Sequence, residues 1–251
     1  MTPAQTPLHI VLAAHGSTEH DGSAAMVRAC ADAITRSGIA SGVVLEAFLR
    51  GGPLALRDAL DVCPAGDVLI LPLLMNDGWF AEVAFPRELD AERPRPHLRR
   101  VTLHPPLGLD PRFPRWVLAS ATQAAVDVQA RRVLIVGHGT ERDTRSARRT
   151  YEIASELREL ITAQNIIRTI DVAFLDQEPR LGDVLQTYDD DEPLLVLPWF
   201  AADGMHASID IPALIAQHRP QNTALTTSVG CQAFPVLAVE IVQQALHESR
   251  L

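Results

Sequence analysis

The chain has 251 residues, of which 47% are hydrophobic and 21% charged, and its formal net charge at pH 7 is −9. This composition is ordinary for a globular protein with an ample core, and the acidic balance argues against a nucleic-acid partner. No apolar run approaches the roughly 18 residues of a membrane span, no signal peptide is evident, and three scattered cysteines fit a reducing compartment, so we expect a cytoplasmic protein with no membrane partner.

The first half of the chain alternates apolar runs with helical patterns. A β-branched run over residues 10–14 predicts a strand that stops at a His-Gly pair. A helix is expected to begin near Ser23, a good N-cap, and to end before Gly38. Apolar runs over residues 44–49 and 67–72 predict two further strands. None of the runs alternates with polar residues, which is typical of a parallel sheet covered on both faces.

The second half repeats this order. A helix over about residues 115–128 precedes the second half. A strand over residues 133–136 then leads to a second His-Gly pair at His138. Apolar runs over residues 171–175 and 194–197 predict the strands that follow. Strands that alternate with helices indicate an α/β fold with a parallel sheet.

Matched positions in the same order show that the two halves are an internal duplication. The matched pairs are Ala47 with Ala173, Pro53 with Pro179, Gly78 with Gly204, Pro86 with Pro212, and Gly108 with Gly230. We therefore predict two similar doubly wound parallel-sheet domains, residues 1–129 and 130–251.

Histidines stand where these strands are expected to end. Ligands of an open parallel sheet bind beyond the carboxyl ends of its strands, so His15 and His138 are expected to face a cleft. His206 also follows a predicted strand, and the sheet can bring its ring close to that of His138. A neutral imidazole can bind divalent iron, cobalt, nickel or zinc and can accept a proton near pH 7. A structural, hydrogen-bonded histidine is the alternative, and the Gly-His-Gly setting favours a functional His138.

The residues around His206 carry a family resemblance. Residues 198–212 read Pro-aromatic, four residues, Gly-x-His, three residues, Asp-Ile-Pro, in the same half as His138-Gly139-Thr140. This combination resembles the sirohydrochlorin chelatases, also called CbiX-like cobalt or iron chelatases, which are class II chelatases related more distantly to ferrochelatase. The resemblance covers essentially the whole chain and matches the long two-repeat form of the family.

The resemblance implies chelatase-like, flavodoxin-like halves and a lyase-type metal chelatase. Such an enzyme inserts Co²⁺ or Fe²⁺, with Ni²⁺ as a third candidate, into sirohydrochlorin or a closely related tetrapyrrole, for cobalamin or siroheme synthesis. It implies that His138 and His206 bind the incoming metal and act in deprotonation of the tetrapyrrole. The metal is a substrate, no cofactor is expected, and no Gly-x-x-x-x-Gly-Lys-Ser/Thr loop for ATP is present in the sequence. A monomer and a homodimer both stay open.

The first half departs from the family pattern. Phe80 stands where the second histidine is expected, so a complete pair exists only in the second half, where we place the site. His15 is then a helper that faces the cleft, a relic of the duplication or a structural residue. Related chelatases often add a carboxylate to the histidine pair, and Glu82 or Asp77 could supply it, although a solvated loop explains both equally well.

The most basic stretch of the chain, residues 141–149, begins just beyond His138. A solvated helix face is the default interpretation. Arginine nevertheless forms bidentate pairs with carboxylates, which sirohydrochlorin carries in number, and helix N-terminal amides would add to the attraction. Arg142 and Arg145 are therefore candidates for binding substrate carboxylates. The acidic run over residues 189–192 is expected to be a solvated turn.

Two other functions fit parts of the pattern. A non-catalytic tetrapyrrole or metal carrier of the same fold could have lost the first-half histidine, and turnover would separate it from an enzyme. Histidine phosphatases also place a His-Gly pair after the first strand, but an arginine precedes that histidine, whereas Ala14 and Gly137 stand here. The intact Gly204-x-His206 motif favours the chelatase.

Overall fold

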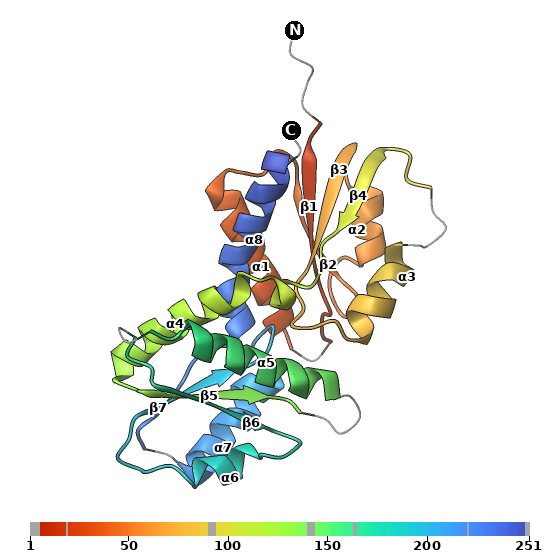
Figure 1. Ribbon diagram of the computed structural model, residues 1–251. Coiled ribbons are helices and arrows are strands. Elements are labelled where there is room, and N and C mark those ends of the chain that lie inside the picture. Colours follow the sequence, from red (N-terminus) through yellow and green to blue (C-terminus); the bar gives the residue numbers. More distant parts are fainter. Residues whose placement is uncertain are drawn as a thin grey trace. The chain divides into compact units, whose positions relative to one another are not determined.

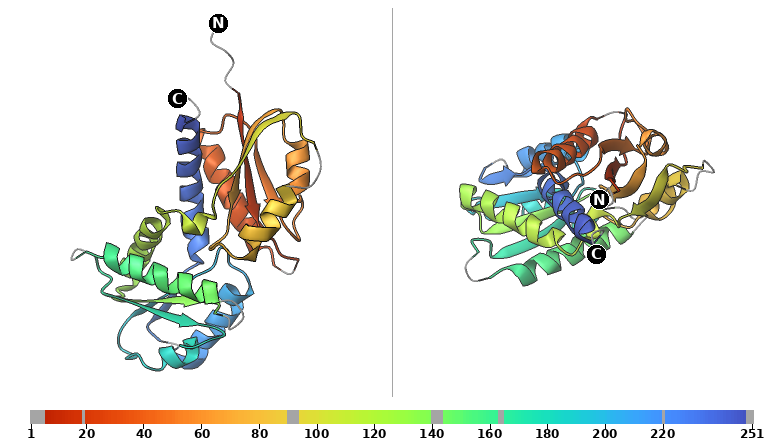
Figure 2. Two further views of the ribbon diagram at one scale, coloured as in Figure 1. Left: turned by 45° about the vertical axis from the view of Figure 1, so that its right-hand side comes forward. Right: turned by 90° about the horizontal axis from the view of Figure 1, so that it is seen from above.

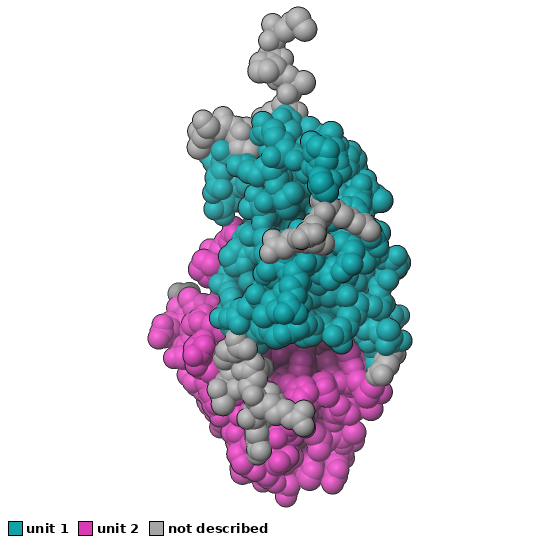
Figure 3. Space-filling model, turned by 90° about the vertical axis from the view of Figure 1, so that its right-hand side faces the viewer, with its two compact units in different colours: residues 1–110, 234–251 teal, residues 111–233 magenta. Residues whose placement is uncertain are grey.

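The computed structural model describes residues 6–18, 20–89, 94–139, 144–162, 165–219 and 221–248. The chain divides into two compact units: unit 1 is Met1–Asp110 with Phe234–Leu251, and unit 2 is Pro111–Ala233 (Figure 3). The strands are β1 Leu8–Ala14, β2 Val44–Phe48, β3 Gly66–Pro72, β4 Leu98–Leu103, β5 Arg132–Gly137, β6 Thr169–Phe174, β7 Leu194–Pro198 and β8 Thr223–Leu225. The helices are α1 Gly22–Ser37, α2 Leu56–Val62, η1 Phe80–Ala84, α3 Phe85–Leu89, η2 Leu107–Leu109, α4 Phe113–Val128, α5 Thr144–Leu160, α6 Leu181–Leu185, η3 His206–Asp210, α7 Ile211–His218 and α8 Val229–Glu248.

Unit 1 is built on a four-stranded parallel sheet in the order β2-β1-β3-β4. Every residue of β1 and β3 is buried, as expected for strands that are apolar on both faces, whereas β4 lies at the edge and exposes its middle residues. In Figure 1, α1 and α8 lie on one side of this sheet and α2 and α3 on the other, and the first view of Figure 2 agrees. Helix α1 ends at Gly38, which has the left-handed φ of 67°, as the sequence predicts.

Unit 2 has the same topology, with a parallel sheet in the order β6-β5-β7-β8. Helices α4 and α5 lie on one face of this sheet and α6 and α7 on the other (Figure 1). The two cores use matched positions, since Ala13 and Ala47 pair in unit 1 where Val136 and Ala173 pair in unit 2. The predicted α/β fold with two similar, doubly wound halves is confirmed.

The compact units and the sequence repeats are different divisions of the chain. The repeats predicted from matched residues are 1–129 and 130–251. Helix α4, however, belongs to unit 2 although it ends the first repeat, and the part of α8 from Phe234 onward belongs to unit 1. The repeats follow from matched residues along the sequence, whereas the compact units follow from where the last helix of each repeat packs.

Helix α8 is the one described helix that is long and apolar enough to cross a membrane by length and composition alone. Seven of its apolar side chains are buried in the folded chain, which accounts for its hydropathy: Val229, Ala233, Phe234, Leu237, Ala238, Ile241 and Val242.

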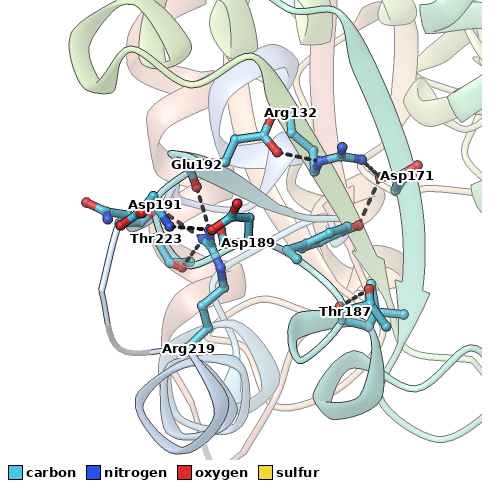
Figure 4. Close-up of polar contacts among 11 residues, drawn as sticks. Arg132, Asp171, Thr187, Asp189, Asp191, Glu192, Arg219 and Thr223 are labelled. Carbon is cyan, nitrogen blue, oxygen red and sulfur yellow. Dashed lines mark hydrogen bonds and ion pairs between the residues drawn. The ribbon is translucent and has the colours of Figure 1, made fainter.

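A buried arginine holds the acidic turn that precedes β7. Arg219 is 1% exposed, and its guanidinium donates hydrogen bonds to the carbonyl oxygens of Asp189, Glu192 and Asn222 (Figure 4). The residues Asp189, Asp190 and Asp191 are exposed, as predicted for a solvated turn, whereas the Glu192 carboxylate forms an ion pair with Arg132 at 3.5 Å. The carbonyls of the turn bind the buried cation. Because this turn lies at the start of β7, it is at the opposite end of the strand from His206 and has a structural role.

Candidate metal site

The site of unit 2 lies where the strand order reverses. Strand β5 pairs with β6 on one side and with β7 on the other, and the carboxyl ends beside such a reversal are where open parallel sheets typically bind ligands. His138 is the first residue after β5, and His206 begins η3, which follows β7. The sheet therefore brings together the two histidines that the sequence singles out.

The imidazole rings of His138 and His206 are in direct contact. Their centroids are 4.5 Å apart and the ring planes make an angle of 87°, an edge-to-face arrangement. The ring of Phe200 stacks on that of His206 with centroids 5.9 Å apart. The two histidine side chains are 41% and 42% exposed, so a ligand can reach them from solvent.

Each ring is oriented through its Nδ1 atom. His138 Nδ1 lies 2.6 Å from the carbonyl oxygen of Gly139, and His206 Nδ1 lies 2.7 Å from Asp210 Oδ2. A carbonyl oxygen and an ionised carboxylate can only accept hydrogen bonds, so each neutral ring carries its proton on Nδ1. The lone pair on Nε2 is then available to another ligand. Metal-binding histidines are typically held in this way.

Two carboxylates lie beside the pair, and sequence reasoning assigned neither of them a role. Asp210 is four residues after His206 on η3, a π-helical segment of the kind that often marks functional sites. Asp176 follows β6, and its Oδ2 is 3.4 Å from His138 Nδ1. Both could have been found in the sequence: Asp210 lies within the quoted motif, and Asp176 follows the Ala-Phe-Leu segment that matches residues 47–49.

The glycine after each strand-end histidine lets the neighbouring segment approach closely. Gly139 has a φ of 70°, and a Cβ there would lie 2.8 Å from the Cβ of Phe174; Gly16 has a φ of 79°, and a Cβ there would lie 1.8 Å from the carbonyl oxygen of Arg50. Another residue at either position would displace the segment that follows β2 or β6. The His-Gly pair is thus a structural requirement as well as a chemical one.

Unit 1 repeats the geometry with different side chains. His15 follows β1, its Nδ1 lies 2.7 Å from the carbonyl oxygen of Gly16, and its ring contacts Phe80 edge-on with centroids 4.1 Å apart. Phe80 begins the π-helical segment η1 as His206 begins η3. The predicted loss of the second histidine is therefore seen as a phenyl ring in its place.

The other predicted residues lie elsewhere. Glu82 and Asp77 are exposed residues of unit 1, so a carboxylate ligand from either stays a prediction, whereas Asp176 and Asp210 lie directly beside the histidine rings. Arg142 lies outside the described residues. Arg145 is on the first turn of α5, beyond the carboxyl end of β5, and only its backbone is described.

The cysteine of unit 2 is a partly buried thiol near Asp203. Burial, reinforced by the charge of Asp203, raises the pKa of Cys231 to about 11. Among the described residues, no group of three or more histidine, cysteine or acidic side chains is placed to hold a metal ion. The donors that unit 2 offers are thus the two Nε2 atoms, with the carboxylates behind and beside them.

Comparison with known proteins shows the family of this chain. The family model CbiX matches residues 9–124 and again residues 132–242. A relative from Halobacterium salinarum, described as a probable sirohydrochlorin cobaltochelatase, is 30% identical over 229 residues, which cover 81% of this chain and 75% of the relative.

Two solved structures share the fold. The structure of CbiX, the terminal enzyme for biosynthesis of siroheme in denitrifying bacteria, matches with a TM-score of 0.68 at 24% identity, over 95% of this chain and 99% of that one. SirB from Bacillus subtilis with Fe³⁺ matches with a TM-score of 0.70 at 20% identity, over 97% of both chains. With both of its repeats matched by the family model, this chain belongs to the CbiX family.

Proposed function

We propose that this protein is a metal chelatase that inserts Co²⁺ or Fe²⁺ into sirohydrochlorin or a closely related tetrapyrrole, without ATP, at the strand ends of unit 2. The observation that carries the proposal is the contact between His138 and His206, each with its Nδ1 bound to an acceptor. The names of the relatives support the substrate class: one is described as a probable sirohydrochlorin cobaltochelatase, one as the terminal enzyme for biosynthesis of siroheme, and one as a sirohydrochlorin chelatase in complex with cobalt.

The histidine pair suits a metal that is delivered rather than kept. Two imidazole nitrogens are borderline donors that accept Co²⁺, Fe²⁺ and Ni²⁺. A metal held by two protein donors keeps coordination positions open, and the pyrrole nitrogens of the macrocycle can occupy these before the protein ligands leave. A closed site of four protein ligands would instead retain the ion.

The chemistry is a proton exchange without a redox step. As M²⁺ enters, four nitrogen–metal bonds form and two pyrrole N–H bonds break, so two protons leave. Once the metal has passed to the pyrrole nitrogens, Nε2 of each neutral histidine is free to accept one of these protons near pH 7. The imidazolium formed at His206 is stabilised by the carboxylate of Asp210, and that at His138 by Asp176. Binding of macrocycle and metal at one crevice makes the encounter intramolecular.

The proposal is tested by anaerobic mixing of the purified protein with sirohydrochlorin and Co²⁺, Fe²⁺ or Ni²⁺ while the absorption change of metal insertion is followed. We expect insertion of Co²⁺ or Fe²⁺ to be accelerated over the protein-free rate, with no change on addition of ATP. Tight binding of the tetrapyrrole with no acceleration for any metal would instead show a carrier. No binding and no acceleration would overturn the proposal altogether.

A further inference from the structure

At one matched position beside the strand-end histidine, unit 1 carries a positive charge and unit 2 a negative one. The backbone N–H of Arg50 donates to the carbonyl oxygen of His15 at 2.9 Å, and the N–H of Asp176 donates to that of His138 at the same distance. Arg50 thus occupies, in unit 1, the position that Asp176 has in unit 2. An arginine there would repel a divalent cation and attract a carboxylate.

The guanidinium of Arg50 is available to a ligand. The residue is exposed, and its side chain makes no hydrogen bond or ion pair with any other residue that the structure describes. Surface arginines of unit 1 that have a structural role are paired, as Arg57 is with Glu88 and Arg99 with Asp67.

Two aromatic side chains, Phe80 and Trp79, lie near His15. Phe80 packs edge-on against His15, and the indole of Trp79, which is 47% exposed, lies 5.2 Å from the Phe80 ring between centroids. A large exposed aromatic ring is costly in water and suits the face or edge of a flat conjugated ligand.

Unit 1 also has a cavity that begins at the residues next to His15 and Arg50 in the chain. Its volume is about 390 Å³, within the usual range of small-molecule sites of about 300–1,000 Å³. It is lined by the residues that directly follow His15 and Arg50, namely Gly16, Ser17, Thr18 and Gly51, and also by His20 and Asp21. The hydroxyls of Ser17 and Thr18 and the imidazole of His20 can donate hydrogen bonds to a carboxylate. The carboxylate of Asp21 would repel an anion bound next to it.

We infer that the strand ends of unit 1, around Arg50, Trp79 and the cavity after His15, form a binding subsite for a carboxylate arm and the adjoining ring edge of the polycarboxylated tetrapyrrole. The inference rests on the proposed function for the identity of the ligand. It assigns Arg50 and Trp79 as substrate-binding residues, with Arg50 in ionic contact with a carboxylate. Unit 1 is then a second binding surface with altered chemistry rather than an inert copy of unit 2.

The test is equilibrium binding of metal-free tetrapyrroles to the full chain, measured by absorption and by quenching of tryptophan fluorescence. We expect Arg50→Ala to raise the Kd for uroporphyrin, which carries eight carboxylates, by about tenfold, because a charge-assisted bidentate contact is lost. Arg50→Lys should restore part of the affinity. Coproporphyrin, which carries four carboxylates, should respond less, and Trp79→Leu should weaken both probes severalfold while Trp79→Phe does so less.

The matched control is Arg28→Ala, which removes the same charge from an exposed position on α1 of the same unit and should leave both Kd values unchanged. Wild-type affinity in Arg50→Ala would overturn the inference and leave the proposed function standing. Binding that depends on Arg50 in a protein that never accelerates metal insertion would overturn the proposed function and leave this subsite standing.

Discussion

At the carboxyl ends of their strands, the two units offer the same backbone with opposite chemistry. In unit 2 the strand-end histidine faces a second histidine, with Asp210 and Asp176 beside the two rings. In unit 1 the equivalent histidine faces Phe80, and Arg50 stands at the position of Asp176. The His-Gly turn, the switch in strand order and the π-helical segment are common to both.

The difference teaches that the fold supplies positions while a few side chains decide which ligand they serve. Nitrogen donors backed by carboxylates suit a cation that must be bound and released. An arginine among aromatic rings suits an aromatic anion. Substitutions at matched positions can therefore break this contrast or extend it.

The largest effect is expected from removal of either histidine of the pair. His138→Ala and His206→Ala each remove a metal ligand and proton acceptor, and kcat/KM for metal insertion should fall by about 10²–10⁴-fold. His15→Ala makes the same change at the matched position of unit 1 and should leave kcat within a few-fold of wild type. Equal losses in all three variants, measured in the anaerobic absorption assay, would contradict the assignment of the site to unit 2.

A smaller loss is expected when the orienting carboxylate is neutralised. Asp210→Asn keeps the shape of the side chain but removes the charge that fixes His206 through Nδ1, so Co²⁺ affinity should fall by about 10–100-fold. Titration of the cobalt absorption bands measures this. Asp183→Asn, at an exposed position on α6, is the control and should titrate like wild type. An unchanged affinity in Asp210→Asn would show that the carboxylate does not orient the ligand.

The contrast can also be reversed by transplanting the metal chemistry. The double variant Phe80→His with Arg50→Asp gives unit 1 a histidine pair and an acid at the matched positions. We expect the Co²⁺ stoichiometry to rise from one toward two per chain, the second site being about tenfold weaker because Ala84 stands where unit 2 has Asp210. Isothermal titration of the double variant and of Phe80→His alone provides the comparison. A stoichiometry that stays at one would show that the backbones are less equivalent than their contacts indicate.

The smallest effect concerns stability at alkaline pH. Burial raises the pKa of Cys231 to about 11, above the roughly 8.5 of an unfolded thiol, so the folded state holds this proton more tightly. The contribution to the free energy of unfolding is complete below about pH 8.5 and is lost as the pH rises toward the folded value. Unit 1 has Leu109, which does not ionise, at the matched position. The variant Cys231→Ala should likewise lose less stability than wild type between about pH 8.5 and pH 10 in urea titrations. Parallel losses in the two proteins would contradict the raised pKa.

Much of the fold could be predicted from the sequence because its signals are local. Apolar runs without alternation mark buried parallel strands, and matched residues reveal the duplication. The exchange of α4 and the end of α8 between the compact units could not be predicted, because the apolar residues of a helix show that it is buried and do not show which sheet it covers. The buried Arg219 was missed because its partners are backbone carbonyls, which no sequence pattern records.

The candidate site could be predicted in part. His138 and His206 were found because strand-end positions in a parallel sheet converge. Asp176 could have been found, since the duplication places it opposite Arg50. The role of Asp210 depends on the π-helical winding of η3, which brings its carboxylate to within 2.7 Å of His206 Nδ1. The sequence shows Asp210 within the motif around His206, but it does not show the π-helical winding that makes this contact.

The most direct test of the central claim is the position of the metal itself. Crystals of the protein soaked anaerobically in Co²⁺ can be measured at the cobalt absorption edge, where anomalous differences locate the ion. We predict one cobalt peak in unit 2, bound by Nε2 of His138 and of His206, and none beside His15. A cobalt ion at His15, or one bound in unit 2 away from the histidine pair, would contradict the account.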